Sequence, residues 1–150
     1  MIEFAVLTAA GVVAWLICRP QPQRDAAAAA AWSQFHRYAT ANGWSMLYIQ
    51  NVYQHAHRGS KAMVSIYGDA VGASRDAWFW WENVQRGSVV AVGLSEGWGP
   101  HTRRDDVLYI GNGDPAPQSG VHATFGAREL VRAQRHFRRQ SAIYAAGTGT

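Results

Sequence analysis

The N-terminal segment constrains this chain most, because residues 1–18 are almost entirely apolar. In MIEFAVLTAAGVVAWLIC only Glu3 and Thr8 carry polar side chains, and the stretch stops at Arg19-Pro20. As an α-helix, about 18 residues would span roughly 27 Å, close to the ~30 Å hydrocarbon core of a bilayer. The sequence therefore predicts a transmembrane anchor over residues 1–18. A buried N-terminal helix and a signal peptide are the alternatives, and no A-x-A-like cleavage site follows the segment.

Charged residues near this segment predict its orientation. Glu3 precedes the apolar run, whereas Arg19, Arg24 and Arg37 follow it. Basic residues flank membrane helices mainly on the cytoplasmic side, so we expect the remainder of the chain in the cytoplasm. Cys18 is the only cysteine, which excludes a scaffold held by internal disulfides.

The polar stretch RPQPQRD predicts a linker over residues 19–25. A helix should follow, with Asp25 as its N-cap and Gly43 as its C-terminal stop. Four apolar side chains share one face of this helix: Ala28, Trp32, Phe35 and Ala39. That face should pack on a sheet.

Five segments rich in β-branched and aromatic residues predict strands, at residues 45–54, 62–67, 77–81, 88–94 and 106–111. Glycines separate most of them. The expected fold class is α+β: after the transmembrane helix, a small antiparallel β-sheet or partly closed barrel flanked by two helices. Residues 26–145 should form this single domain, and residues 146–150 a disordered tail.

The second helix is predicted over residues 124–146, in TFGARELVRAQRHFRRQSAIYAA. Its apolar face comprises Leu130, Ala133, Phe137 and Tyr144. Its opposite face, which we call the arginine stripe, comprises Arg128, Arg132, Arg135 and Arg139. In a tethered cytoplasmic domain such a stripe would face anionic lipid headgroups. An ordinary solvated helix face is the alternative.

A long loop, SEGWGPHTRRDD, separates the last two predicted strands. It has about a dozen residues, more than a hairpin requires. Its candidate binding residues are Trp98, His101, Arg103 and Arg104, side-chain types that are common in binding hot spots. Alternatively, Trp98 covers the sheet while the two arginines pair with Asp105 and Asp106.

The stretch Gly93-Leu94-Ser95-Glu96-Gly97 matches the G-x-S-x-G nucleophile elbow. The elbow needs a helix directly after the serine, but Gly97, Gly99 and Pro100 oppose a helix there. Asp105 or Asp106 and His122 do follow in the chain order of α/β hydrolases, yet the chain is too short for that fold. We interpret the motif as a turn and predict no catalytic residue.

His55 and His57 are two residues apart on a predicted strand, so both rings could approach one metal ion. A metal site needs at least one more ligand, and His101, His122 and Asp69 are the candidates. The sequence does not place any of them beside the pair, and two histidines on a solvated strand end are the alternative. We therefore predict neither a metal nor another cofactor.

The stretch GWGPHTRRDDVLYIG, in a chain rich in Ala, Arg, Gly and Trp, resembles small single-pass membrane proteins of high-GC actinobacteria and their phages. The resemblance covers residues 97–111 and the general layout. It contains no motif of known mechanism, so no functional residue is carried over from it. It implies a phage or prophage accessory protein that acts at the host membrane.

These observations predict a non-enzymatic, membrane-anchored interaction protein that presents a small β-rich domain and a basic helix at the membrane face. Besides the membrane, its expected partner is a protein, with anionic lipid as a further candidate and nucleic acid less favoured. The net charge of +4 suits each of these anionic surfaces. Two alternatives remain: a metal-dependent or serine hydrolase that uses the His and G-x-S-x-G residues, and a structural accessory subunit of a membrane complex.

Overall fold

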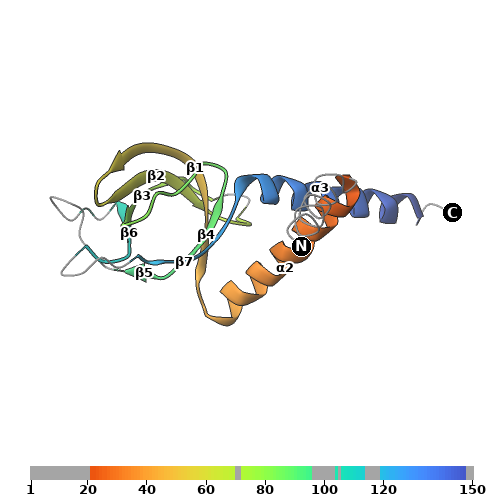
Figure 1. The fold of residues 1–150 in the computed structure, drawn as a ribbon, viewed down its shortest axis with the longest axis horizontal. Coiled ribbons are helices and arrows are strands. Elements are labelled where there is room, and N and C mark those ends of the chain that lie inside the picture. Colours follow the sequence, from red (N-terminus) through yellow and green to blue (C-terminus); the bar gives the residue numbers. More distant parts are fainter. Residues whose placement is uncertain (1–20, 70–71, 96–103, 105, 114–118, 148–150) are drawn as a thin grey trace, which may run out of the picture.

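The computed structural model describes residues 21–69, 72–95, 104, 106–113 and 119–147. They form a curled sheet with two helices packed together at one end of it (Figure 1). Within these ranges no helix combines the length and the hydropathy needed to cross a membrane. The predicted anchor at residues 1–18 lies outside the described residues.

Seven strands form one sheet: β1 (Ser45–Ala56), β2 (Gly59–Ile66), β3 (Arg75–Trp80), β4 (Val89–Val92), β5 (Leu94–Ser95), β6 (Val107–Ile110) and β7 (Val121–Phe125). Their order is β5-β6-β3-β2-β1-β4-β7. The α+β class with a curled sheet and two helices is confirmed. The prediction of an antiparallel sheet is wrong, because β3 and β6 are parallel. Residue patterns locate strands but do not encode the direction of a neighbour that is distant in sequence.

The sheet curls because β1 is long and irregular. Its pairing with β2 shifts register between Ile49 and Asn51 and again between Val52 and Gln54, and such bulges bend a strand. The first residues of β1 also pair with β4, which leads through Gly93 into β5 and so to β6. We call this partly closed sheet the barrel.

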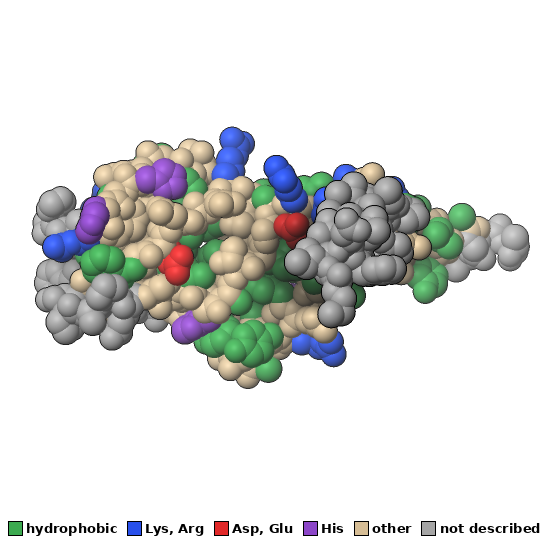
Figure 2. Space-filling view, in the orientation of Figure 1, with side chains coloured by type: hydrophobic (Ala, Val, Ile, Leu, Met, Phe, Trp, Pro, Cys, Tyr) green, Lys and Arg blue, Asp and Glu red, His purple; other side chains and the backbone are tan. Residues whose placement is uncertain are grey.

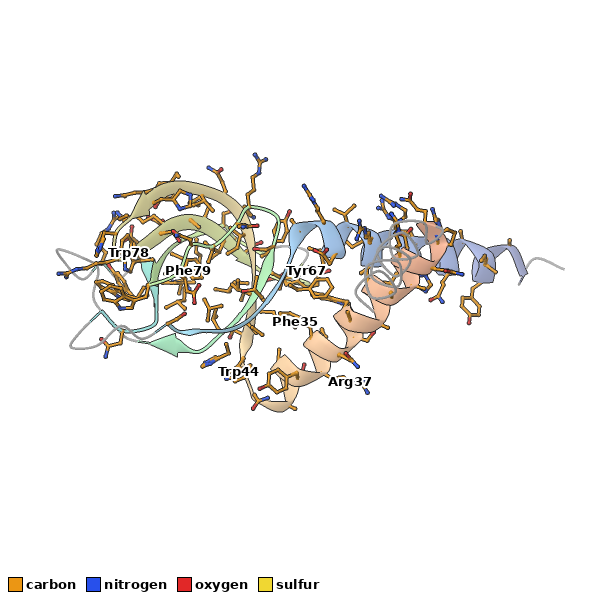
Figure 3. All side chains as sticks on the ribbon, viewed as in Figure 1. Phe35, Arg37, Trp44, Tyr67, Trp78 and Phe79 are labelled. Atoms are coloured by element: carbon orange, nitrogen blue, oxygen red, sulfur yellow. The ribbon has the colours of Figure 1, made fainter. Side chains whose placement is uncertain are left out.

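Aliphatic side chains and one phenylalanine fill the barrel. The buried set is Leu47, Ile49, Ala62, Val64, Ala77, Phe79, Val84, Val90, Val92 and Ile110. Phe79 lies inside the curled sheet, whereas Trp78 lies at the end away from the helices (Figure 3). A glycine at position 59 is required beside this core, since a Cβ there would lie 1.9 Å from the Phe79 carbonyl oxygen.

Helices α2 (Gln21–Ala41) and α3 (Ala127–Gly147) close one end of the barrel. The predicted apolar face of α2 is confirmed, because Ala28, Trp32 and Ala39 are buried. The Trp32 ring lies 4.7 Å from that of Tyr67 and 5.1 Å from that of Phe125. This face packs on α3 and on the end of the barrel rather than across a flat sheet.

Several predicted boundaries are wrong. Residues 21–25, expected in a linker, belong to α2, so Asp25 is not its N-cap. Val121–Phe125 forms strand β7, although residues 124 and 125 were assigned to the second helix. A strand is consistent with the β-branched and aromatic side chains before Gly126. Helix α3 continues to Gly147, into the segment expected to be a tail.

Candidate functional site

A buried carboxylate connects the two helices. Asp25 on α2 is fully buried, and the Nη1 atoms of Arg135 and Arg139 on α3 lie 3.4 and 3.1 Å from its two carboxylate oxygens. A buried charge without partners would be costly, so each guanidinium compensates for lost hydration. Two members of the arginine stripe therefore hold the helices together. Arg135 and Arg139 therefore do not belong to an ordinary solvated face, because both side chains reach Asp25 on α2.

Position in the sequence could have revealed this role of Asp25. It precedes Ala28 by three residues and Trp32 by seven, a spacing that puts all three on one helix face. An acidic side chain on an apolar face needs a cationic partner. The prediction of Asp25 as an N-cap followed a local preference instead, because carboxylates are common at the first position of a helix.

The first half of α3 and the start of α2 form a shallow, open groove of about 420 Å³, which we call the arginine groove. Its lining residues are Gln21, Ala127, Arg128, Val131, Arg132 and Arg135. Arg132 makes a long ion pair, 3.9 Å, with Glu129. Arg128 forms no ion pair with any residue in the described part of the chain. Several Lys and Arg side chains lie over the helices and their junction with the barrel (Figure 2).

The arginine groove has an excess of positive charge. The four arginines of the stripe face two acidic side chains, Asp25 and Glu129. The groove also lies along the first turns of α3, where the helix dipole is positive. Cations are electrostatically unfavourable at that end of a helix, and a bound anion would relieve their repulsion. The site is therefore suited to a single anionic group.

Of the four candidate binding residues in the predicted loop, the structure describes Arg104, just before β6. Trp98, His101 and Arg103 lie outside the described residues. Arg104 forms the ion pair with Asp106 that the alternative interpretation expected. This contact lowers the pKa of Asp106 and raises that of Arg104. Both side chains are exposed, so the pair should contribute little to stability.

An aromatic cluster lies next to Arg104 on the outer face of β3 and β6, since the Arg104 backbone N–H donates to the Tyr109 hydroxyl at 3.0 Å. Trp78, Trp80 and Tyr109 are buried there with Val107, and Trp81 packs beside them. Trp78 and Trp80 meet edge to face, with ring centroids 5.4 Å apart. The buried Trp78 Nε1 has no hydrogen-bond partner among the residues that the structure describes. We missed this cluster, although alternate residues of AWFWW are large on both faces of the strand, which indicates a strand covered on both sides.

Trp81 holds two segments together at the same end. Its φ angle of 62° is a rare, strained conformation for a bulky residue. Its backbone N–H donates to the carbonyl of Arg58, and its indole Nε1 donates to the carbonyl of Asn112, both at 2.8 Å. These bonds tie the β1–β2 turn and the residues after β6 to the end of β3.

The histidines do not converge. His55 Nδ1 lies 3.4 Å from the Asn83 side-chain oxygen near the end of β1. His122 stacks on Trp44, 4.2 Å away, near the opposite end of that strand. Among the described residues no three His, Cys, Asp or Glu side chains are grouped as metal ligands would be.

Ser95 does not occupy a nucleophile elbow. It lies in β5, in register with Tyr109 of β6, whereas an elbow serine sits on a sharp turn between a strand and a helix. Our interpretation of the motif as a turn is wrong at Ser95, which is a strand residue, whereas the predicted strand character of Leu94 is confirmed.

Tyr53 makes a polar contact on the barrel surface. Its hydroxyl donates a hydrogen bond to Asp76 of β3. Burial first, and then the hydrogen bond and the charge of Asp76, raise the pKa of Tyr53 to about 12. The phenol is therefore neutral at physiological pH and acts as a hydrogen-bond donor.

A smaller cavity of about 220 Å³ opens between β1, β2, β3 and β6. Leu47, Val64 and Leu108 contribute apolar surface to it, and Asp69 and Arg75 are its charged lining residues. The described candidate binding residues thus fall into two groups, the arginines of α3 and Arg104 before β6. Comparisons of the chain with models of protein families, with curated proteins and with solved structures found no match.

Proposed function

We propose that this chain is a non-enzymatic, single-pass membrane protein that holds its α+β domain at the cytoplasmic membrane face and binds a protein partner there. The position of Gln21 supports this proposal. Gln21 lines the arginine groove and follows the predicted anchor by three residues, counted from Cys18. Three residues extend at most about 10 Å, and each headgroup layer is roughly 5–8 Å thick.

This short connection makes the groove a surface at headgroup level. With residues 1–18 in the hydrocarbon core, the chain cannot move Gln21 far from the interface. The arginines that line the groove then meet the anionic leaflet, where each contributes about 1 kcal/mol of attraction. The transmembrane anchor and the arginines of α3 would then both attach the domain to the same membrane.

The segment before β6 is the candidate protein-binding element. It contains Trp98, His101, Arg103 and Arg104, and its described residue Arg104 contacts Tyr109 of the aromatic cluster. Long loops on a rigid sheet are frequent recognition elements. The resemblance to phage-encoded membrane proteins favours an accessory or exclusion role, with a host or competing-phage protein as the partner.

Membrane fractionation of the full chain with a C-terminal tag tests the anchor and its orientation. We expect the protein to resist alkaline carbonate extraction, and its tag to be protected from protease in intact spheroplasts until lysis. A variant with Ala9→Arg and Val12→Arg should become extractable, since each mid-span arginine costs about 2.5–3.5 kcal/mol. Extraction of the wild-type chain would refute the anchor. Digestion of the tag in intact spheroplasts would refute the cytoplasmic orientation.

A further inference from the structure

We propose that the arginine groove binds the phosphate of an anionic membrane phospholipid. This inference rests on the proposed function, because the anchor would bring the groove to the membrane. The ligand class is inferred from the described side chains that line the groove. It assigns a ligand class to the arginine groove, whereas the proposed protein partner is assigned to the segment before β6.

The groove presents guanidinium groups from successive turns of one helix. Arg128 and Arg132 are four residues apart and Arg135 follows three residues later, so all three lie on one side of α3. A guanidinium can donate two parallel hydrogen bonds to phosphate oxygens. Arg135 is already positioned by Asp25, so binding would immobilise mainly Arg128 and Arg132.

Apolar surface beside these arginines favours a lipid over a free phosphate ion. Val131 is 49% exposed, and it lines the groove together with Ala127. A phosphodiester with a glycerol and the first acyl carbons would cover this wall, whereas inorganic phosphate would leave it in water. The site therefore has the amphipathic character of a headgroup and its attached backbone.

The same features disfavour nucleic acid as the ligand. None of the described lining residues is aromatic, so these residues offer no platform for base stacking. Among the described lining residues three are arginines, and two of these already contact a carboxylate. This charge suits one phosphodiester, whereas nucleic-acid sites neutralise phosphates along an extended track.

Lipid binding to the full-length protein in maltoside micelles tests the proposal. Native mass spectrometry would measure retained phosphatidylglycerol, with phosphatidylcholine as the neutral comparison. In Arg128→Gln/Arg132→Gln, phosphatidylglycerol should bind roughly 10- to 30-fold more weakly. Arg37→Gln/Arg58→Gln has the same net charge, and both of its arginines are exposed; neither lines the groove. This control should change binding by no more than about threefold, because distant surface charges are screened.

Each outcome decides the question. If phosphatidylglycerol binding is weakened in the groove variant but not in the control, the site is supported. If binding is weakened equally in the control, or in neither variant, the proposal is overturned. Displacement by inorganic phosphate or by an RNA oligomer at the concentration of the lipid would also overturn the lipid assignment. If the double variant misfolds by circular dichroism, Arg128→Gln alone should still weaken binding roughly fivefold. Carbonate extraction of the groove variant should be unchanged, so failure of the anchor and failure of the groove are distinguishable.

Discussion

The barrel interior and the contact between α2 and α3 are two cores built on different chemistry. The described barrel core is apolar apart from Ser60, whose hydroxyl is bonded to the backbone. The helix contact instead combines Trp32, Leu130 and Ala133 with the buried charge of Asp25. An apolar core tolerates small rearrangements, because dispersion and burial are not directional. A carboxylate held by two arginines allows far fewer arrangements. The barrel therefore should supply most of the stability, and the helix contact should set how the basic helix is oriented.

The largest effect should come from the barrel. Phe79→Ala removes a fully buried ring from the core and should reduce the free energy of unfolding by about 3–5 kcal/mol. Urea denaturation would measure it, with the exposed Tyr38→Ala as the control. A loss below about 1 kcal/mol would show that the barrel is not the dominant core.

In the ion-pair cluster, removal of the two arginines should reduce the free energy of unfolding more than neutralisation of Asp25. Replacing Arg135 and Arg139 by Ala leaves the Asp25 carboxylate buried and unpaired, which should cost about 3 kcal/mol. Asp25→Asn should cost less, about 1–2 kcal/mol, because the half-exposed arginines can rehydrate. Adding Asp25→Asn to the double variant should then restore stability. Urea denaturation would compare the triple variant with the double variant. If the triple variant is no more stable, the unpaired Asp25 charge is not the cause of the destabilisation, and the helix contact does not depend on it.

A smaller, pH-dependent effect is expected at the barrel surface. The pKa of Tyr53 is raised in the folded state to about 12, from an ordinary value of 10. Folding therefore favours the neutral phenol, so its contribution is complete below pH 10 and is lost as pH rises through about 12. Phenolate absorbance should show one tyrosine titrating late, and Tyr53→Phe should remove that step. An unchanged titration would argue against the bond to Asp76.

The smallest effect should be at the end of α3, which projects beyond the rest of the molecule (Figure 1). Ile143 and Tyr144 are 71% and 76% exposed there. Replacing both by Ser should change the free energy of unfolding by no more than about 0.5 kcal/mol. Thermal denaturation would measure this. A clear destabilisation would mean that these side chains are buried in solution, for example against another copy of the chain.

Local properties of the chain were readable from its sequence. Strand-forming composition located five of the seven strands, and helical spacing identified the buried face with Ala28 and Trp32. The two-residue strand β5 was merged with β4, and β7 was missed because its last two residues were assigned to the following helix. The apolar character of residues 1–18 is likewise a property of the sequence alone.

Only the tertiary structure decided which distant segments meet. The parallel pairing of β3 with β6 depends on the path of the chain through β4 and β5. The arginine stripe divides into Arg135 and Arg139, which hold Asp25, and Arg128 and Arg132, which line the groove with Gln21. Periodicity shows which side chains share a face of one helix. It does not show which element that face contacts, because that choice depends on how the whole chain buries its apolar surface and pairs its charges.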